Sequence, residues 1–138
     1  MRILGLDVGE KTIGVAMSDP LGWTAQALQV IRRSTLEEDF AALKELVEQY
    51  KVEKFVVGLP RRTDGSYGPE VEKIYSFASE LKRYFQLPVE YWDERFSTAA
   101  AQRILLQGDV SRAKRRKVID KVAAAVILQA YLDRKRSD

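Results

Sequence analysis

Alternating apolar and polar positions divide the first part of the chain into three predicted strands. Residues 2–8 form a near-continuous apolar run, which is typical of a central strand buried on both faces. After a tight turn at residues 9–11, apolar side chains alternate with small or polar ones over residues 12–18, so we expect a second strand paired with the first as a hairpin. Residues 27–32 have the pattern of a third strand. The chain therefore opens with a three-stranded meander.

Helical periodicity begins after this meander. The sequence Ser34-Thr35-Leu36-Glu37 is a capping box, which marks the start of a helix. The helix that follows has one apolar face, formed by Leu36, Phe40, Leu43, Val47 and Tyr50. The rest of the chain predicts, in order, a short buried strand, a helix, a strand and two further helices, at residues 54–57, 69–85, 89–92, 97–107 and 112–134. We therefore expect one α/β domain over residues 1–138, with a mixed five-stranded sheet and helices on its faces.

The residue types that are missing narrow the possible chemistry. The 138 residues include no histidine and no cysteine. A Ser-His-Asp triad, an imidazole-bound zinc site and a disulfide are therefore excluded, and catalysis falls to carboxylates, lysines, tyrosines or hydroxyls. The N-terminal segment lacks a signal-peptide pattern, because Asp7 interrupts its apolar run, and no later apolar stretch is long enough to span a bilayer. We therefore expect a cytoplasmic protein that does not enter the membrane.

Two acidic residues stand at or just after the ends of predicted strands. Asp7 lies near the end of the central strand, where a carboxylate is costly unless a partner or a metal ion compensates it. Strand alternation places it on the same face as Gly5, which leaves space beside it, although Asp7 could instead accept N–H groups of the turn. Glu94 follows the last predicted strand and by itself could be an ordinary loop residue. If the two strands are parallel neighbours, both acids lie at the carboxyl edge of the sheet, where the sites of open α/β folds gather.

A third acid, Asp120, lies in the final predicted helix. The apolar positions of this helix form one stripe, made of Ile119, Val122, Ala123, Val126, Ile127 and Ala130. At about 100° per residue, Asp120 falls roughly 90° from the centre of this stripe, at an edge from which its carboxylate could reach Asp7. The alternative is an exposed pair with Arg116, one turn earlier. Asp109 and Asp133 lack this position, so Asp120 is the helix acid that we expect beside Asp7.

Basic residues gather in two places. Residues 112–117 read RAKRRK, although the net charge of the whole chain is only +3. Such a run indicates a nucleic-acid surface or, alternatively, the solvated start of a helix. Two consecutive arginines also follow the fourth predicted strand, where guanidinium forks suit phosphate oxygens. The candidate phosphate contacts are Arg61, Arg62, Lys114, Arg115 and Lys117.

Four stretches together resemble the YqgF family, also called RuvX, whose members are described as Holliday-junction resolvases and as pre-16S ribosomal RNA nucleases. They are LGLDVGEKTIGVAMSD, VVGLP, DERFSTAAA and KVIDKVAAAVILQAYLD, in this order, and the match covers essentially the whole chain. The resemblance implies a ribonuclease H-like fold related to the RuvC resolvases. It assigns the catalytic and metal-binding roles to Asp7, Glu94 and Asp120, with Mg²⁺ or Mn²⁺ as the cofactor, and places Arg95 among the nucleic-acid contacts.

The sequence departs from the wider RuvC pattern at two points. No acid stands at Gly58-Leu59-Pro60, where the preceding strand of RuvC proteins supplies one, and only Asp120 matches the two aspartates of their last helix. The site could therefore hold metal differently or more weakly.

The expected function is metal-dependent hydrolysis of phosphodiester bonds in the 5′-end processing of pre-16S rRNA. The partner is nucleic acid, either precursor rRNA or branched DNA, so a Holliday-junction resolvase is one alternative. A catalytically silent nucleic-acid-binding protein with the same fold is another. An ATP-binding module is a third, because a D-x-G turn also opens actin-like kinases, but 138 residues leave no room for the second domain that those proteins need.

Overall fold

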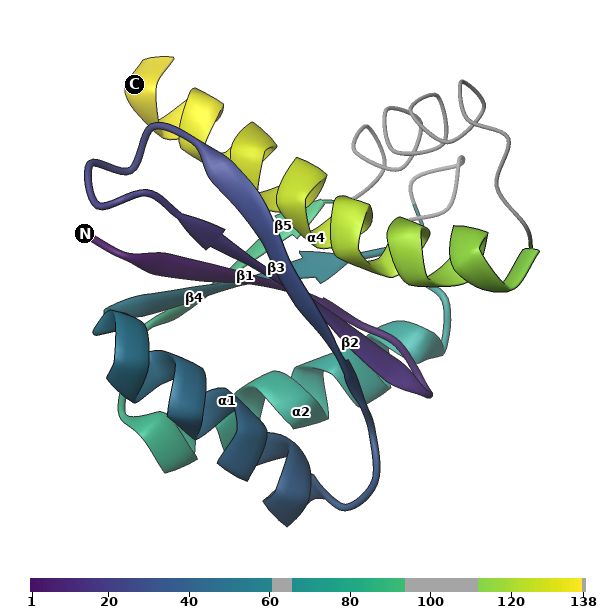
Figure 1. Cartoon of the computed structure of the whole chain (residues 1–138). Coiled ribbons are helices and arrows are strands. Elements are labelled where there is room, and N and C mark those ends of the chain that lie inside the picture. Colours follow the sequence, from purple (N-terminus) through teal and green to yellow (C-terminus); the bar gives the residue numbers. More distant parts are fainter. Residues whose placement is uncertain (61–65, 94–111, 138) are drawn as a thin grey trace.

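The chain folds into three layers, with a sheet between helices on both faces (Figure 1). The computed structural model describes residues 1–60, 66–93 and 112–137, and only the backbone of 112–121 and 137. The strands are β1 (Ile3–Val8), β2 (Thr12–Ser18), β3 (Ala25–Arg32), β4 (Lys54–Leu59) and β5 (Val89–Asp93). The helices are α1 (Leu36–Tyr50) and α2 (Glu70–Phe85), which cover one face, and α4 (Arg112–Ser137), which covers the other. The predicted helix at 97–107 lies outside the described residues.

The sheet is mixed and has five strands, as predicted. Its order is β3-β2-β1-β4-β5, which makes β1 the central strand. The β1–β2 and β2–β3 pairs are antiparallel, whereas β1–β4 and β4–β5 are parallel. The carboxyl ends of β1, β4 and β5 therefore share one edge of the sheet. β1 and β5 are not neighbours, because β4 lies between them.

Three predicted strands are longer in the structure: β5 by one residue, and β3 and β4 by two residues each. β3 begins at Ala25, because this residue pairs with Ser18 of β2. β4 continues through Gly58 and Leu59, although glycine followed by proline signals a strand end. The cause is pairing with β5, which holds Gly58 opposite its Trp92 in the parallel register.

The cap of α1 lies one residue later than predicted. The Oγ1 atom of Thr35 accepts the backbone N–H of Glu38 at 3.1 Å, so Thr35 and not Ser34 is the N-cap. The backbone N–H of Ser34 instead donates to the carboxylate of Asp39 at 3.0 Å.

Two hydrophobic cores lie on opposite faces of the sheet. The larger core fills the space between the sheet and helices α1 and α2, and it contains Leu4, Leu6 and Val8 of β1. The smaller core lies under α4 and contains residues of both the sheet and the helix. The sheet contributes Ile3, Ala16 and Val56, and α4 contributes Ala124, Ile127, Leu128, Tyr131 and Leu132. Strand alternation thus sends even-numbered β1 residues to one core and odd-numbered ones, Asp7 included, toward α4. None of the described helices combines the length and hydrophobicity that a membrane crossing requires.

Gly5 sets how closely α4 approaches the sheet. A Cβ atom at this position would lie 2.8 Å from Cβ of Leu128 and 3.3 Å from the backbone oxygen of Ala124. Because Cβ atoms do not approach one another to 2.8 Å, Gly5→Ala should push α4 outward and lower the free energy of unfolding by about 1–3 kcal/mol. Urea unfolding measures this loss. An unchanged unfolding free energy would mean that α4 does not lie against Gly5.

A polar cluster joins α4 to the amino ends of β4 and β5. The Nζ atom of Lys54 lies 2.5 Å from Oε1 of Glu90 and donates to the hydroxyl of Tyr131 at 2.6 Å. The hydrogen bond from Lys54 lowers the pKa of Glu90. Burial lowers the pKa of Lys54, but its bonds to Glu90 and Tyr131 outweigh this effect and raise it overall.

Replacing Glu90 with glutamine should therefore lower stability at neutral pH but not in acid. A carboxyl group whose folded pKa is lowered stabilises the fold above its ordinary pKa of 4.5, and this stabilisation is lost as the pH falls through the folded value. Because the Glu90 side chain is 40% exposed, we expect an effect of at most about 1 kcal/mol. Unfolding measured between pH 3 and pH 7 should show the two proteins converging below about pH 4. Glu48→Gln, at an exposed pair with Lys44, is the matched control and should change little.

Candidate functional site

Asp7 is flanked by glycines on both neighbouring strands. It lies in β1, directly before the last strand residue, and pairs with Gly14 of β2. On the other side, Leu6 pairs with Val57 of β4, so Gly58 is the β4 residue beside Asp7. Glycines in strand interiors weaken the sheet and mark places where a ligand or another backbone comes close. The residues directly beside the half-buried Asp7 on β2 and β4 therefore add no side chain next to its carboxylate.

The turn after Asp7 is held by several hydrogen bonds. The N–H of Gly9 donates to the carbonyl of Thr12 at 2.9 Å, and the N–H of Arg33 donates to the carbonyl of Lys11 at 2.8 Å. The Nη1 atom of Arg33 also donates to the carbonyl of Gly9 at 2.7 Å. The backbone that carries Asp7 is thus fixed beyond the end of its strand.

Arg33 in turn is held by Asp39, a residue whose role the sequence did not reveal. Asp39 is 2% exposed, and its carboxylate lies 3.4 Å from Nε of Arg33. From the sequence, Asp39 looks like one of several solvated acids in the first turn of a helix. The sequence did contain a signal that Asp39 is buried: its position falls on the same helix face as Leu43 and Leu46, which are both buried.

The path of α4 brings Asp120 level with Asp7. α4 runs antiparallel to β1, since Ala124 lies over Gly5 whereas Tyr131, further along the helix, contacts Lys54 at the start of β4. Asp120 lies one turn before Ala124, which is about 6 Å along the helix axis. Asp7 lies two residues beyond Gly5, which is about 6.6 Å along the strand. Counted from the contact between Ala124 and Gly5, the two backbone positions therefore lie about equally far along α4 and β1 toward the carboxyl end of β1.

The predicted apolar stripe of α4 was wrong in phase. The buried positions are Ala124, Ile127, Leu128, Tyr131 and Leu132, whereas Val122, Ala123, Val126 and Ala130 are half-buried. The reason is the close contact at Gly5, which brings Leu128 and the backbone of Ala124 against the sheet. The backbone of Asp120 is consequently in line with the buried row through Ala124 and Leu128, and not 90° away from the centre of the buried face.

Asp93, the last residue of β5, lies at the same carboxyl edge and directly precedes Glu94 in the sequence. Glu94 itself lies outside the described residues, as do Arg61, Arg62 and Arg95. Within the described part of the chain, no three acidic residues are grouped closely enough to hold a metal ion. The strand that contains Asp7 and the strand that ends just before Glu94 thus share the carboxyl edge of the sheet, and the helix that carries Asp120 runs past this edge.

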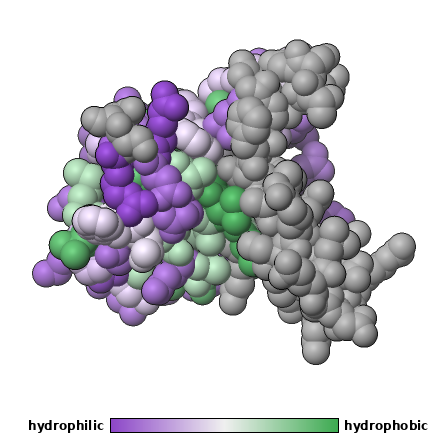
Figure 2. All heavy atoms as spheres, turned by 90° about the horizontal axis from the view of Figure 1, so that it is seen from above, coloured by the Kyte–Doolittle hydropathy of each residue, from purple (hydrophilic) through white to green (hydrophobic). Residues whose placement is uncertain are grey.

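The basic run lies in the first turns of α4. Arg112 precedes Ala124 by twelve residues, so the helix begins about 18 Å before its contact with Gly5 and extends past the level of Asp7. Lys114, Arg115 and Lys117 belong to this projecting part, where only the backbone is described. Seen from the α4 side, the described surface is mainly hydrophilic, with a smaller hydrophobic area near the centre of the view (Figure 2).

Comparison with known proteins gives a consistent result. Residues 1–134 match the family model described as RuvX, Holliday junction resolvase. A protein of Desulforamulus reducens is 58% identical, and the match covers 96% of this chain and 97% of that protein. A protein of Symbiobacterium thermophilum is 64% identical, and the match covers 96% of this chain and 92% of that protein. Both carry the name "Putative pre-16S rRNA nuclease".

Structural comparison confirms the ribonuclease H-like fold. The solved structure of Thermus thermophilus RuvC in complex with a Holliday junction substrate matches with a TM-score of 0.61, covering 99% of this chain and 97% of its own, at 16% identity. At that identity the likeness concerns the fold alone. The family model and the near full-length relatives decide the family: this chain belongs to the RuvX family.

Proposed function

We propose that this chain is a metal-dependent endonuclease that hydrolyses phosphodiester bonds in the 5′-end processing of pre-16S rRNA. The supporting observation is the setting of Asp7. Its carboxylate is flanked by Gly14 and Gly58, and the backbone of Asp120 lies level with it. Asp7 also lies at the carboxyl edge of the sheet, where β5 ends one residue before Glu94. The relatives named as pre-16S rRNA nucleases favour RNA as the substrate. We place the enzyme in the cytoplasm, as one domain over residues 1–138.

The residues present fit a hard divalent cation. Asp7, Glu94 and Asp120 offer only oxygen ligands, which Mg²⁺ and Mn²⁺ prefer. Gly14 and Gly58 beside Asp7 have no side chains that would compete with an ion or a phosphate group for its carboxylate. When bound, the cation supplies a water of lowered pKa and neutralises charge that builds up on the phosphate. Three carboxylates close together without a cation would repel one another, so the same set is costly in any purely structural role.

The chain's own residues have separate tasks in this reaction. The carboxylates of Asp7, Glu94 and Asp120 would hold the ion and would orient the attacking water toward the phosphorus atom. Arg61, Arg62 and Arg95 would bind phosphate oxygens with their guanidinium forks. The start of α4, with Lys114, Arg115 and Lys117, would contact the phosphate backbone further along the strand, without reading its sequence.

A Holliday-junction resolvase is the second candidate, favoured by the description of the matching family model. One experiment separates the candidates: incubation of the protein with a 5′-extended 16S rRNA precursor and with a four-way DNA junction, each with Mg²⁺, Mn²⁺ or a chelator. We expect cleavage of the precursor at a defined 5′ position with either metal ion, and none with chelator. Cleavage of the junction alone would favour the resolvase, and binding without any cleavage would favour a silent binding protein.

The basic turns of α4 should determine how strongly binding depends on salt. Replacing Lys114, Arg115 and Lys117 with glutamine should weaken binding about equally for different sequences. Each lost phosphate contact should reduce the slope of log K against log salt by about 0.7 on single strands or about 0.9 on duplex DNA. Titrations at several salt concentrations measure this slope. A slope equal to that of the wild type would show that these three residues do not touch phosphate.

A further inference from the structure

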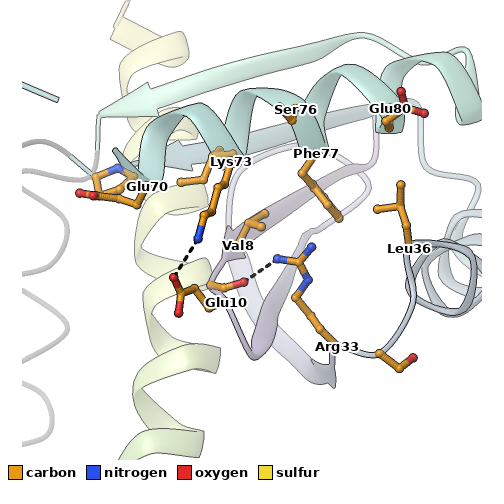
Figure 3. Close-up of a pocket in the computed structure, with 13 residues that line it drawn as sticks. Val8, Glu10, Arg33, Leu36, Glu70, Lys73, Ser76, Phe77 and Glu80 are labelled. Carbon is orange, nitrogen blue, oxygen red and sulfur yellow. Dashed lines mark hydrogen bonds and ion pairs between the residues drawn. The ribbon is translucent and has the colours of Figure 1, made fainter. Parts of the chain in front are cut away.

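A groove of about 830 Å³ opens on the face of the sheet opposite α4 (Figure 3). Its walls are the segment that enters α1 and one side of α2, and it reaches Val8 and Gly9, which directly follow Asp7. Figure 3 shows Arg33 and Leu36 pointing into it from one wall and Lys73 crossing it from the other toward Glu10. The proposed reaction gives this groove no task.

Arg33 forms a fixed platform in the groove. Its guanidinium carbon lies 5.2 Å from the centre of the Phe77 ring, while Nη1 donates to Gly9 and Nε faces Asp39. Phe77 and Asp39 are both buried, so the guanidinium is held by groups that cannot move easily. The side chain nevertheless stays 25% exposed. An arginine held in this way can stack on a planar ring without first losing side-chain freedom.

The charges around the groove select against a phosphate group and in favour of a base. Three glutamates line it, Glu10, Glu70 and Glu80, and Lys73 is paired with Glu10 at 3.2 Å. This excess of carboxylates repels phosphate oxygens but accepts hydrogen bonds from the amino groups of nucleobases. Leu36, 39% exposed, adds apolar surface for a flat ring. We propose that the groove binds one nucleobase of the substrate strand, stacked on Arg33, an inference that rests on the proposed nuclease function.

The position of the groove fixes which base enters it. Consecutive residues of a strand point to opposite faces, so Asp7 points toward α4 and Val8 toward the groove. An RNA strand whose phosphate group lies at Asp7 must cross the carboxyl end of β1 before a neighbouring base can enter the groove. That base has to leave its stack, which is least costly in single-stranded or unpaired RNA. The groove should therefore favour unpaired nucleotides beside the cleaved bond.

The test measures binding of single-stranded RNA that spans the mapped cleavage site, with Ca²⁺ in place of Mg²⁺. Each nucleotide in turn is replaced by an abasic residue. We expect one position next to the cleaved bond at which the loss of the base weakens binding by about tenfold, within the range for base stacking. Leu36→Trp, which puts a large ring on the same wall as Arg33 and obstructs the stacking position, should bind the intact and the abasic strand equally. Leu21→Trp, at a residue that is 79% exposed and outside the groove, should keep the tenfold difference.

Arg33→Lys should also remove the difference, but it disturbs the contact with Asp39 and could unfold the protein, so Leu36→Trp is the deciding variant. Equal binding of all abasic strands by the wild type would overturn the groove proposal and leave the nuclease function intact. A persistent tenfold difference in folded Leu36→Trp would also overturn it. Failure of the wild type to bind or cleave any strand would overturn both proposals.

Discussion

Asp7→Asn is expected to abolish metal-dependent cleavage while leaving the fold intact. The amide is nearly isosteric with the carboxylate, but it lacks the charge that a divalent cation needs. A bound cation supplies several kcal/mol of transition-state stabilisation, so losing a ligand should lower the cleavage rate about a hundredfold or more. The flanking Gly14 and Gly58 offer no side chain that could replace the missing oxygen. Cleavage rates at saturating Mg²⁺, with circular dichroism as a check on folding, measure the effect.

The same variant should lose its stabilisation by metal. An ion that binds only the folded protein raises the melting temperature, by an amount that grows with the ion concentration relative to its dissociation constant. We therefore expect Mn²⁺ to raise the melting temperature of the wild type but to leave Asp7→Asn nearly unchanged. Full cleavage by Asp7→Asn, or cleavage by the wild type in chelator, would contradict the proposed role.

The central part of the fold could be predicted because its signals are local. A near-continuous apolar run identified β1 as the central strand, and the position of that strand made the carboxylate of Asp7 unusual. The end of β4 was misplaced because glycine and proline act on the chain locally, whereas pairing with β5 keeps Gly58 in the sheet. Only the partner strand, which lies 30 residues away in sequence, carries that information.

The phase of α4 could not be predicted for a related reason. Two overlapping apolar stripes can be drawn along its sequence. The valines, which are larger than the alanines, favour the stripe that is mostly half-buried. The choice is made by Gly5 on a distant strand, because its missing side chain lets Leu128 and the backbone of Ala124 come close to the sheet. The contact of Arg33 with the buried Asp39 is likewise invisible in the sequence, because burial of a charged residue depends on its partner. Both features shape the surroundings of Asp7, so the geometry of the site is less predictable than the identity of its acids.

Asp120→Asn is the variant that decides whether the helix supplies a metal ligand. The backbone of Asp120 lies one turn before Ala124 and level with Asp7, which is the position that a third ligand requires. If Asp120 is a ligand, the variant should fold normally but cleave about a hundredfold or more slowly. It should also melt at or above the wild-type temperature without metal, because it relieves repulsion with Asp7 and Glu94. Added Mn²⁺ should then raise its melting temperature less than that of the wild type.

Two control variants on the same helix make this result specific. Asp133→Asn removes a carboxylate more than three turns further along α4, where it is exposed and bonded to Gln129 and Arg136, so its cleavage rate should match that of the wild type. Arg116→Gln tests the alternative of a surface pair with Asp120, which would cost only about 0.2–0.5 kcal/mol of stability. If Asp120→Asn and Arg116→Gln both lower stability by that small amount and both cleave normally, Asp120 is a surface partner and the third ligand lies elsewhere. Loss of cleavage and of metal stabilisation in Asp120→Asn alone would establish that the last helix completes the site begun by Asp7.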